Sequence, residues 1–391
     1  MYKSTQNKGE LGFRFGTESR IYLLSPSTVC LNNQYLFCTV EAFFRLNNYP
    51  LASGIEDSDI VVVNTCGYTD NVMREHLERI AKLNQRKQVI VFGCLSRLAQ
   101  ELQSDREIIL IGPKESHKFS VIFEHEIACE DIISSQCTRL PYNAEIDEPS
   151  HGFVQISQGC SNHCSYCNIK LAKGNVKSKP IAIVENEVAN LIHKLRFNIT
   201  LLADDCGSYG HDIGTDMVEL MTRLRTMDDR LKIKIYTIFP GLFLKYYQGL
   251  EPYFLDDFVT FACVPVQSGS GRILDLMNRN YNLEEVKAAV SKIKSLSATA
   301  HLFTHFIVNF PTETIDDFRK SLEIARIFDF CFFLAYGENA RTPAAQITPK
   351  CKDTDLDAKI AILKQAIESQ SVKGTFVGQR DVSFHEWPKW G

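Results

Sequence analysis

Three cysteines lie close together in the middle of the chain, with three residues between the first two and two between the last two. They are Cys160, Cys164 and Cys167, and an apolar stretch at 151–158 that is typical of a buried strand leads into them. Thiolates at this spacing can wrap an iron–sulfur cubane, and three of them leave one iron without a protein ligand. Because substrates and cofactors bind at open metal positions, this barrel trio predicts a reactive centre.

Two alternatives remain for this loop. A structural zinc site requires four ligands, and the nearby candidate for the fourth is His163, which lies inside the loop and which we interpret as a solvated residue. A chance cluster of inert buried thiols is the second alternative, since cysteine is often a small buried hydrophobe.

A second set of cysteines is spread along the first hundred residues. Short apolar runs separated by helical segments such as 72–83 predict an α/β unit with a Rossmann-like parallel sheet. These strands are expected at 21–25, 60–64, 88–92 and 108–111. Loops after parallel strands share one edge of the sheet, so the cysteines that follow the first three strands should converge on a second cluster site. This upstream trio is Cys30, Cys66 and Cys94, and buried structural thiols are again the alternative.

Beyond residue 150 the pattern changes to short strands that alternate with amphipathic helices. From 151 to about 345 this predicts a partial (β/α) barrel whose functional loops follow the strands. A strand expected at 199–203 leads into a polar loop at 203–212 that contains Asp204 and Asp205. We interpret this loop as contacting a bound ligand, and an ordinary turn with a capping aspartate is the alternative.

The barrel trio, with an aromatic residue directly before its last cysteine, resembles the signature of the radical S-adenosylmethionine (SAM) superfamily. The resemblance implies a [4Fe–4S] cluster on Cys160, Cys164 and Cys167, with SAM chelating the open iron and Tyr166 near the adenine. It also implies that an electron from the cluster cleaves SAM to a 5′-deoxyadenosyl radical. That radical abstracts hydrogen from an unactivated carbon.

The upstream part resembles the N-terminal domain of the methylthiotransferases, a radical SAM subfamily. The matching features are Asn64 to Cys66 after one strand, Gly93 and Cys94 after the next, and Cys30 followed by Asn33. The resemblance implies a second [4Fe–4S] cluster on Cys30, Cys66 and Cys94. Cys38 is the alternative to Cys30, which lies nearer the first strand and has the asparagine that the family pattern requires.

Later blocks of the barrel match this family in order, and the loop at 203–212 is most similar to the ribosomal-protein aspartate methylthiotransferases. By this resemblance Gln267 and Arg279 hold the ribose and carboxylate of SAM, while Asp204 and Asp205 contact its aminoacyl group and the substrate. An arginine after a helix could equally form a surface ion pair, which stays the alternative for Arg279.

Some positions depart from the family pattern. Asp204 stands where glutamine is expected, Asn309 and Thr312 where glycine is usual, and Lys170 where proline is usual. Because these loops face the active site, the substrate assignment stays open. Cys206 lies on the same loop as Asp204, and its role is also open.

Length and composition fit an enzyme of two main domains. The 391 residues include 13 cysteines but no export signal and no apolar run long enough to span a membrane, so we expect a cytoplasmic protein. The formal net charge of −4 lacks the global basic footprint of a nucleic-acid binder. We predict an N-terminal extension, the N-terminal cluster domain, a linker, the radical SAM barrel and a C-terminal helix with a tail, at 1–19, 20–125, 126–150, 151–350 and 351–391.

Methylthiotransferases normally end in the TRAM domain, a small β-barrel that binds nucleic acid or a protein partner. After a helix predicted at 355–371, the remaining residues can form at most one strand, near 375–379, so no complete TRAM domain is expected. Basic runs at 82–87 and 170–179 are candidate RNA contacts, although such runs are more often solvated faces.

Together these features predict a radical SAM methylthiotransferase with two [4Fe–4S] clusters. By family analogy, one SAM methylates a sulfur carried at the upstream trio and a second SAM provides the radical, so that the substrate gains a C–S–CH3 group. A peptide or protein side chain is the favoured acceptor and a tRNA adenosine the alternative, with flavodoxin or ferredoxin as electron donor. Two further hypotheses are a radical SAM enzyme without a working upstream cluster and a non-catalytic binding protein.

Overall fold

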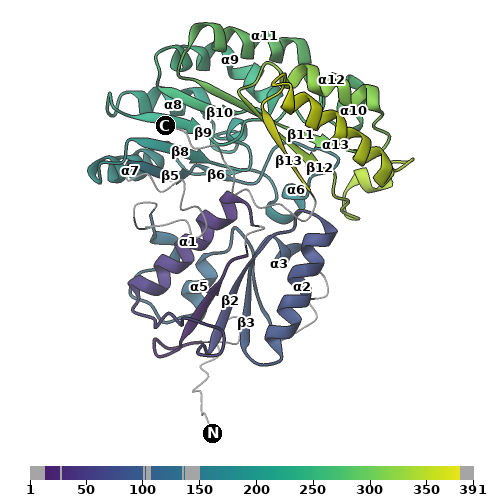
Figure 1. Cartoon of the computed structure of the whole chain (residues 1–391). Coiled ribbons are helices and arrows are strands. Elements are labelled where there is room, and N and C mark those ends of the chain that lie inside the picture. Colours follow the sequence, from purple (N-terminus) through teal and green to yellow (C-terminus); the bar gives the residue numbers. More distant parts are fainter. Residues whose placement is uncertain are drawn as a thin grey trace.

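The computed structural model describes residues 14–26, 29–99, 102, 107–133, 136 and 150–378. Figure 1 shows two α/β domains, with the N-terminal sheet below and the larger C-terminal sheet above it. This arrangement confirms the predicted order of a Rossmann-like domain followed by a partial barrel.

The N-terminal domain is built on a four-stranded parallel sheet in the order β1-β2-β3-β4. Its strands are β1 (Ile21–Leu24), β2 (Ile60–Thr65), β3 (Gln88–Gly93) and β4 (Ile109–Ile111). Its helices are α1 (Leu31–Leu46), α2 (Asp70–Asn84), α3 (Leu95–Leu98) and α5 (His117–Ile122). Helices α1 and α5 cover one face and α2 and α3 the other, so the valine and isoleucine side chains of β2 are buried on both sides.

The chain adds its next segments on opposite sides of β1, so the order of strand addition changes direction at this strand. After α1 it forms a parallel bridge from Leu51 to Ile21 on the outer side of β1, and then crosses to β2 on the inner side. Such a reversal places successive helices on opposite faces and opens a crevice beyond the carboxyl ends of the strands, where α/β proteins bind ligands. Cys30 and Cys66 follow the two strands that border this crevice.

The second domain is an open sheet of seven parallel strands in the order β13-β12-β11-β10-β9-β8-β5. The strands are β5 (His151–Gln155), β8 (Asn198–Leu202), β9 (Lys232–Ile235), β10 (Val259–Cys263), β11 (His301–Val308), β12 (Phe330–Ala335) and β13 (Gly374–Val377). The helices on its outer side are α7 (Ile181–His193), α8 (Met217–Arg225), α9 (Pro240–Leu255), α11 (Leu283–Leu296), α12 (Ile315–Ala325) and α13 (Asp353–Glu368) (Figure 1). Strands in sequential order with right-handed connections place their helices on one face, which produces this half-barrel.

Both domains extend beyond the predicted boundaries. Phe15 forms a bridge with Phe123, and Cys129 packs in the same core, so the N-terminal domain exceeds 20–125 at both ends. Strand β13 pairs with β12 and covers its edge, so the barrel sheet continues past residue 350. The tail at 379–391 lies outside the described residues. None of the described helices has the length and apolar character needed to cross a membrane.

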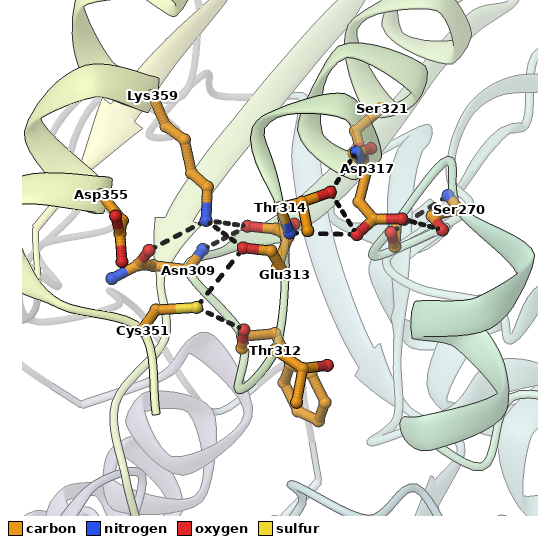
Figure 2. Close-up of polar contacts among 12 residues, drawn as sticks. Ser270, Asn309, Thr312, Glu313, Thr314, Asp317, Ser321, Cys351, Asp355 and Lys359 are labelled. Carbon is orange, nitrogen blue, oxygen red and sulfur yellow. Dashed lines mark hydrogen bonds and ion pairs between the residues drawn. The ribbon is translucent and has the colours of Figure 1, made fainter. Parts of the chain in front are cut away.

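A buried ion pair attaches α13 to the loop after β11 (Figure 2). Lys359 Nζ lies 3.0 Å from Glu313 Oε2, and neither side chain is exposed. Lys359 also donates to Asn309 Oδ1 at 2.9 Å, and the Asn309 backbone N donates to Glu313 Oε2 at 2.6 Å. The pair therefore fixes the last helix and the loop against each other.

Replacing Lys359 by Met should lower the free energy of unfolding by about 3–5 kcal/mol, because it leaves the Glu313 carboxylate buried without its cation. Urea denaturation measures this effect. The matched control is Lys292→Met, which breaks a pair with Glu251 (Nζ–Oε1 2.7 Å) whose lysine side chain is 55% exposed and should cost much less. Equal losses in the two variants would contradict the stabilising role of the buried pair.

Candidate active site

The barrel trio lies on a loop whose two ends are held by short strands. β6 (Ser157–Gln158) and β7 (Lys177–Ser178) pair antiparallel on either side of it, and α6 (Ile169–Lys173) follows the last cysteine. Gly159 has a φ of +85°, and a Cβ there would lie 2.3 Å from the carbonyl oxygen of Asn175. Glycine is therefore required where the chain turns into the loop.

Each sulfur of the barrel trio accepts a hydrogen bond from an N–H group. The donors are Asn162 N (3.4 Å) and Nδ2 (3.3 Å) to Cys160, Arg279 Nη1 (3.3 Å) to Cys164, and Ile169 N (3.5 Å) to Cys167. Donors aimed at a sulfur favour the thiolate over the thiol. The loop therefore suits sulfurs that carry negative charge, as the ligands of an iron–sulfur cluster do.

Burial opposes ionisation of Cys160 and Cys167. Desolvation raises the pKa of Cys160 to about 12, and desolvation followed by repulsion from Cys164 raises the pKa of Cys167. Binding as thiolates thus requires cationic partners such as iron ions. In the described part of the chain, no three His, Cys, Asp or Glu side chains surround a point where a single metal ion would bind. A cubane distributes its thiolates over different irons and does not need such a point.

The upstream trio lies at the carboxyl edge of the N-terminal sheet. Cys30 is the N-cap of α1, and Cys66 and Cys94 directly follow β2 and β3. Burial raises the pKa of all three thiols, that of Cys94 to about 11, and electrostatic repulsion within the trio adds to this at Cys66 and Cys94. Asn33 Nδ2 donates to Cys94 Sγ at 3.3 Å and to the carbonyl oxygen of Thr65 at 3.0 Å, which ties two of the loops together. The three side chains therefore lie close together, and their role as ligands remains a prediction.

The alternative first ligand, Cys38, lies inside α1. It is eight positions after Cys30, about 12 Å farther along the helix at the usual rise per residue, and is buried there. The geometry thus favours Cys30.

The two trios face each other across the seam between the domains. Asn168, directly after Cys167, donates from Nδ2 to the carbonyl oxygen of Gly67, directly after Cys66, at 2.9 Å. Tyr68 is near both trios, since after desolvation the charges of Cys167 and Cys66 raise the pKa of its hydroxyl, and 39% of the residue is exposed. No pattern in the sequence singled out Tyr68. A substrate atom held in this seam would be near both sulfur sites.

Asp204 and Lys173 form a buried ion pair in the same seam. Lys173 Nζ lies 2.8 Å from Asp204 Oδ1, with 0% and 3% of the side chains exposed. The second oxygen of Asp204 accepts from the Gly159 backbone N at 2.8 Å. Both carboxylate oxygens thus have protein partners, so Asp204 holds a lysine where the sequence predicted a contact to SAM. Sequence analysis missed Lys173 because it lies in a basic run. The available signal was Asp204, an acidic residue at a position where the family has glutamine.

Asp205 takes the capping role that the sequence left as an alternative. Its carboxylate accepts from Gly207 N at 3.1 Å, Phe239 N at 2.9 Å, Ser208 Oγ at 2.7 Å and Asn162 Nδ2 at 2.7 Å. Four protein donors leave it little capacity for SAM, and it instead orients Asn162 toward Cys160.

Arg279 is not the surface ion pair that was considered, because only 4% of it is exposed. Its guanidinium lies over the rings of Phe239 and Tyr281, at 4.6 and 5.6 Å, and Nη1 donates to Tyr166 Oη at 3.2 Å. Its Nε has no partner among the described residues. The structure thus brings a buried cation, Tyr166 and Cys164 together.

Gln267 lies in a strained part of the backbone near this cation. Its φ is +74°, a conformation that side chains other than glycine rarely adopt, and its buried Oε1 has no hydrogen-bond donor among the described residues. Unpaired atoms on Gln267 and Arg279 are compatible with a polar ligand such as SAM, and their contacts to it remain predictions.

The remaining described cysteines are not part of either trio. Cys206 is fully buried, and its Sγ donates to the carbonyl oxygen of Leu201 at 3.5 Å, so it belongs to the core beneath its loop. Cys351 Sγ donates to the carbonyl oxygen of Phe310 at 3.0 Å (Figure 2). Cys38, Cys129, Cys263 and Cys331 are also buried. Cys137 lies outside the described residues.

The two positions where glycine was expected keep the backbone conformation that glycine favours. Asn309 and Thr312 have φ values of +69° and +71°. Arg272 donates to both the hydroxyl and the carbonyl oxygen of Thr312, at 2.9 Å each, and Lys359 holds Asn309. These side-chain contacts thus stabilise the positive-φ backbone conformation of the loop, which glycine would adopt more easily.

Comparisons with known proteins show the family to which this chain is similar. The family described as "Radical SAM superfamily" matches residues 154–325, and that described as "Uncharacterized protein family UPF0004" matches residues 27–111. A probable threonylcarbamoyladenosine tRNA methylthiotransferase of Pyrococcus abyssi is 30% identical over 76% of this chain and 72% of its own length. The ribosomal protein uS12 methylthiotransferase RimO of Thermosipho africanus is 29% identical over 86% of this chain and 80% of its own length.

Among solved structures, the radical S-adenosylmethionine methyltransferase TsrM of Kitasatospora setae is similar with a TM-score of 0.58. It is 14% identical, and the match covers 84% of this chain and 75% of TsrM. At this identity the likeness supports the fold, a Rossmann-like domain joined to a radical SAM barrel.

Anaerobic reconstitution with iron and sulfide should load about eight irons per chain, four at each trio. Replacing the barrel trio by alanine, or the upstream trio by alanine, should leave about four irons in either case. Iron and sulfide analysis measures this, and Cys38→Ala is the matched control that should keep about eight. About four irons in the unaltered protein would show that one trio holds no cluster.

Proposed function

Because this chain belongs to the radical SAM methylthiotransferase family, we propose that it adds a methylthio group to an unactivated carbon of a peptide or protein side chain. Family membership implies SAM and a [4Fe–4S] cluster, and we propose a second cluster at the upstream trio. The observation that carries the proposal is the seam, where Asn168 beside Cys167 is hydrogen-bonded to Gly67 beside Cys66. A carbon between the trios could lose hydrogen on one side and gain sulfur on the other.

The donor sets fit the two cofactors. When bound, the clusters would supply the electron that cleaves SAM and the position that carries the sulfur. The N–H groups of Asn162, Ile169 and Arg279 would hold the barrel thiolates, and Asn33 would hold Cys94. Arg279 and Gln267, each with an unpaired buried atom, would bind the polar groups of SAM near Tyr166.

The protein itself supplies orientation and exclusion of water. Asp205 fixes the Cys160 loop through Asn162, and the Lys173–Asp204 pair fixes its first residue, Gly159. Close packing across the seam keeps a reactive carbon radical away from solvent and near its partner sulfur. An electron donor such as flavodoxin or ferredoxin would provide the reducing equivalent.

The charge distribution supports a protein acceptor over RNA. In the basic run at 170–179, Lys173 is buried against Asp204 and Lys179 pairs with Glu187 at 2.5 Å. In the run at 82–87, Lys87 Nζ donates to the carbonyl oxygens of Glu56 and Ser58. These three lysines are held by protein partners, whereas Lys82 and Lys177 of the same runs are exposed, so the runs offer phosphates fewer free charges than their sequence suggests.

A tRNA adenosine is the second candidate acceptor. It is favoured by the 30% identity to a relative named as a tRNA methylthiotransferase. A radical SAM enzyme without the second cluster is the remaining alternative, and iron analysis distinguishes it.

Cys30→Ala should abolish transfer of the methylthio group, by at least about a hundredfold, because a second cluster needs all three thiolates. Formation of 5′-deoxyadenosine from SAM should persist, because the barrel trio is intact. Mass spectrometry of candidate peptide substrates and chromatography of 5′-deoxyadenosine measure the two reactions, with Cys38→Ala as the control that keeps both. Methylthiolation by Cys30→Ala would show that sulfur is not delivered from the upstream trio.

Total tRNA should bind weakly and with a shallow dependence on salt, since the net charge is −4 and lysines of both basic runs are held by protein partners. Gel shifts at increasing salt concentration measure this. Tight binding that falls steeply with salt would favour the tRNA acceptor over the peptide.

A further inference from the structure

A polar cavity lies in the seam between the domains, beside the β6–β7 hairpin that encloses the barrel trio. Its volume is about 160 Å³. Lys114, in the loop after β4, lines it from the N-terminal domain, and the end of β5 and the strands β6 and β7 line it from the barrel. None of the described side chains that line it is acidic, and none belongs to either trio. The cavity is therefore separate from both cluster sites.

Two buried hydrogen-bond donors in this cavity lack an acceptor. Ser157 Oγ and Gln155 Nε2 have no hydrogen-bond partner among the described residues, and the two residues are only 2% and 3% exposed. Gln158 Nε2 donates to Gln155 Oε1 at 2.9 Å, which holds the Gln155 amide in place. Because buried polar groups in folded proteins are nearly always paired, these two donors indicate a ligand that accepts hydrogen bonds.

Three lysine side chains line the same cavity. Lys114 Nζ donates to the carbonyl oxygen of Asn175 at 2.5 Å, and Lys179 pairs with Glu187 at 2.5 Å. Lys177 is exposed and has neither an ion pair nor a side-chain hydrogen bond among the described residues. A ligand in the cavity thus meets ammonium groups as well as neutral donors, a combination that favours an anion with oxygen acceptors.

The charge balance around the cavity favours a single carboxylate. Glu187 neutralises Lys179, and Asp212 accepts from the backbone N of Ser178 in β7 at 2.9 Å. Set against the three lysines, these two carboxylates leave one net positive charge. That charge matches one carboxylate, whereas an RNA strand carries a row of phosphates that Asp212 would repel.

We propose that this cavity binds the carboxylate of an acidic residue in the acceptor peptide, and the proposal rests on the proposed function for the presence of such a peptide. The carboxylate accepts hydrogen bonds from two ammonium groups and two buried neutral donors, those of Lys114, Lys177, Ser157 and Gln155. Gln158 Oε1, a buried acceptor without a donor among the described residues, accepts a backbone N–H group of the same peptide.

The place of the cavity along the chain limits where the acidic residue lies in the acceptor. Gln158 precedes Cys160 by two residues, so their Cα atoms are at most about 7 Å apart. A peptide held at the cavity reaches the barrel trio within a short stretch of extended chain. The acidic residue is therefore expected within about three positions of the modified residue.

The test is equilibrium binding of a probe peptide, acetyl-Gly-Asp-Gly-amide, to the anaerobically reconstituted full-length protein, followed by saturation-transfer NMR. The matched peptide acetyl-Gly-Asn-Gly-amide lacks the charge and should bind at least about tenfold more weakly. Lys177→Met should weaken binding of the aspartate peptide by a similar factor. Its control, Lys82→Met, removes an exposed lysine outside the cavity and should leave binding unchanged. Equal affinity for the two peptides, or an unchanged affinity in Lys177→Met, would overturn the proposal.

Ser157→Ala separates a contact to the ligand from a structural role. It removes a buried hydroxyl that has no partner among the described residues, so the urea midpoint should stay the same or rise. Affinity for the aspartate peptide should nevertheless fall by at least about threefold, because the ligand loses a donor. Unchanged affinity in this variant would contradict the contact.

Competition identifies the anion. Inorganic phosphate and total tRNA, each added to the complex with the aspartate peptide, should displace the peptide poorly. Efficient displacement by either one that is lost in Lys177→Met would show a phosphate site and overturn the carboxylate assignment. None of these readouts requires methylthio transfer. A protein that binds the aspartate peptide as described but transfers no methylthio group would therefore refute the proposed function and leave the carboxylate site standing.

Discussion

Six cysteine side chains lie buried or partly buried along one seam between two parallel sheets, and the groups around them offset the electrostatic cost of placing them there. Burial raises the pKa of thiols in each trio: that of Cys160 in the barrel trio to about 12 and that of Cys94 in the upstream trio to about 11. Thiolates can be held in such a place only if other groups compensate their charge. The chain provides N–H donors to sulfur, the buried guanidinium of Arg279 and the buried ammonium of Lys173. These donors and cations favour anionic ligands in the seam.

The topology explains how residues so far apart in sequence reach the same seam. Parallel strands present their following loops at one edge, and both sheets turn that edge toward each other (Figure 1). The contacts of Asn168 with Gly67, and of Asn32 Nδ2 with the carbonyl oxygen of Ala203 at 2.8 Å, fix the two edges. The outer helices cover the barrel sheet, and the buried Lys359–Glu313 pair attaches the last of them, α13, to the loop after β11 (Figure 2).

The sequence predicted the strands and the grouping of cysteines because both follow from local patterns. β2 was expected at 60–64 and spans Ile60–Thr65, and the three loops after the first strands converge as parallel pairing requires. Long-range packing was not predictable in this way. Lys173 looked like part of a solvated basic run, and its partner Asp204 is 31 positions away. The burial of Arg279 depends on rings from two other segments, Phe239 and Tyr281. Strand β13 was expected near 375–379 and spans Gly374–Val377, but its pairing with β12 was not predicted.

The central claim is that two separate iron–sulfur sites face each other across this seam. An iron anomalous-difference map from crystals of the anaerobically reconstituted protein tests it most directly. The account predicts two peaks, one bounded by Cys160, Cys164 and Cys167 and the other by Cys30, Cys66 and Cys94, with Tyr68 and the Lys173–Asp204 pair beside the space between them. A single peak, or iron bound to cysteines outside the two trios, would contradict it.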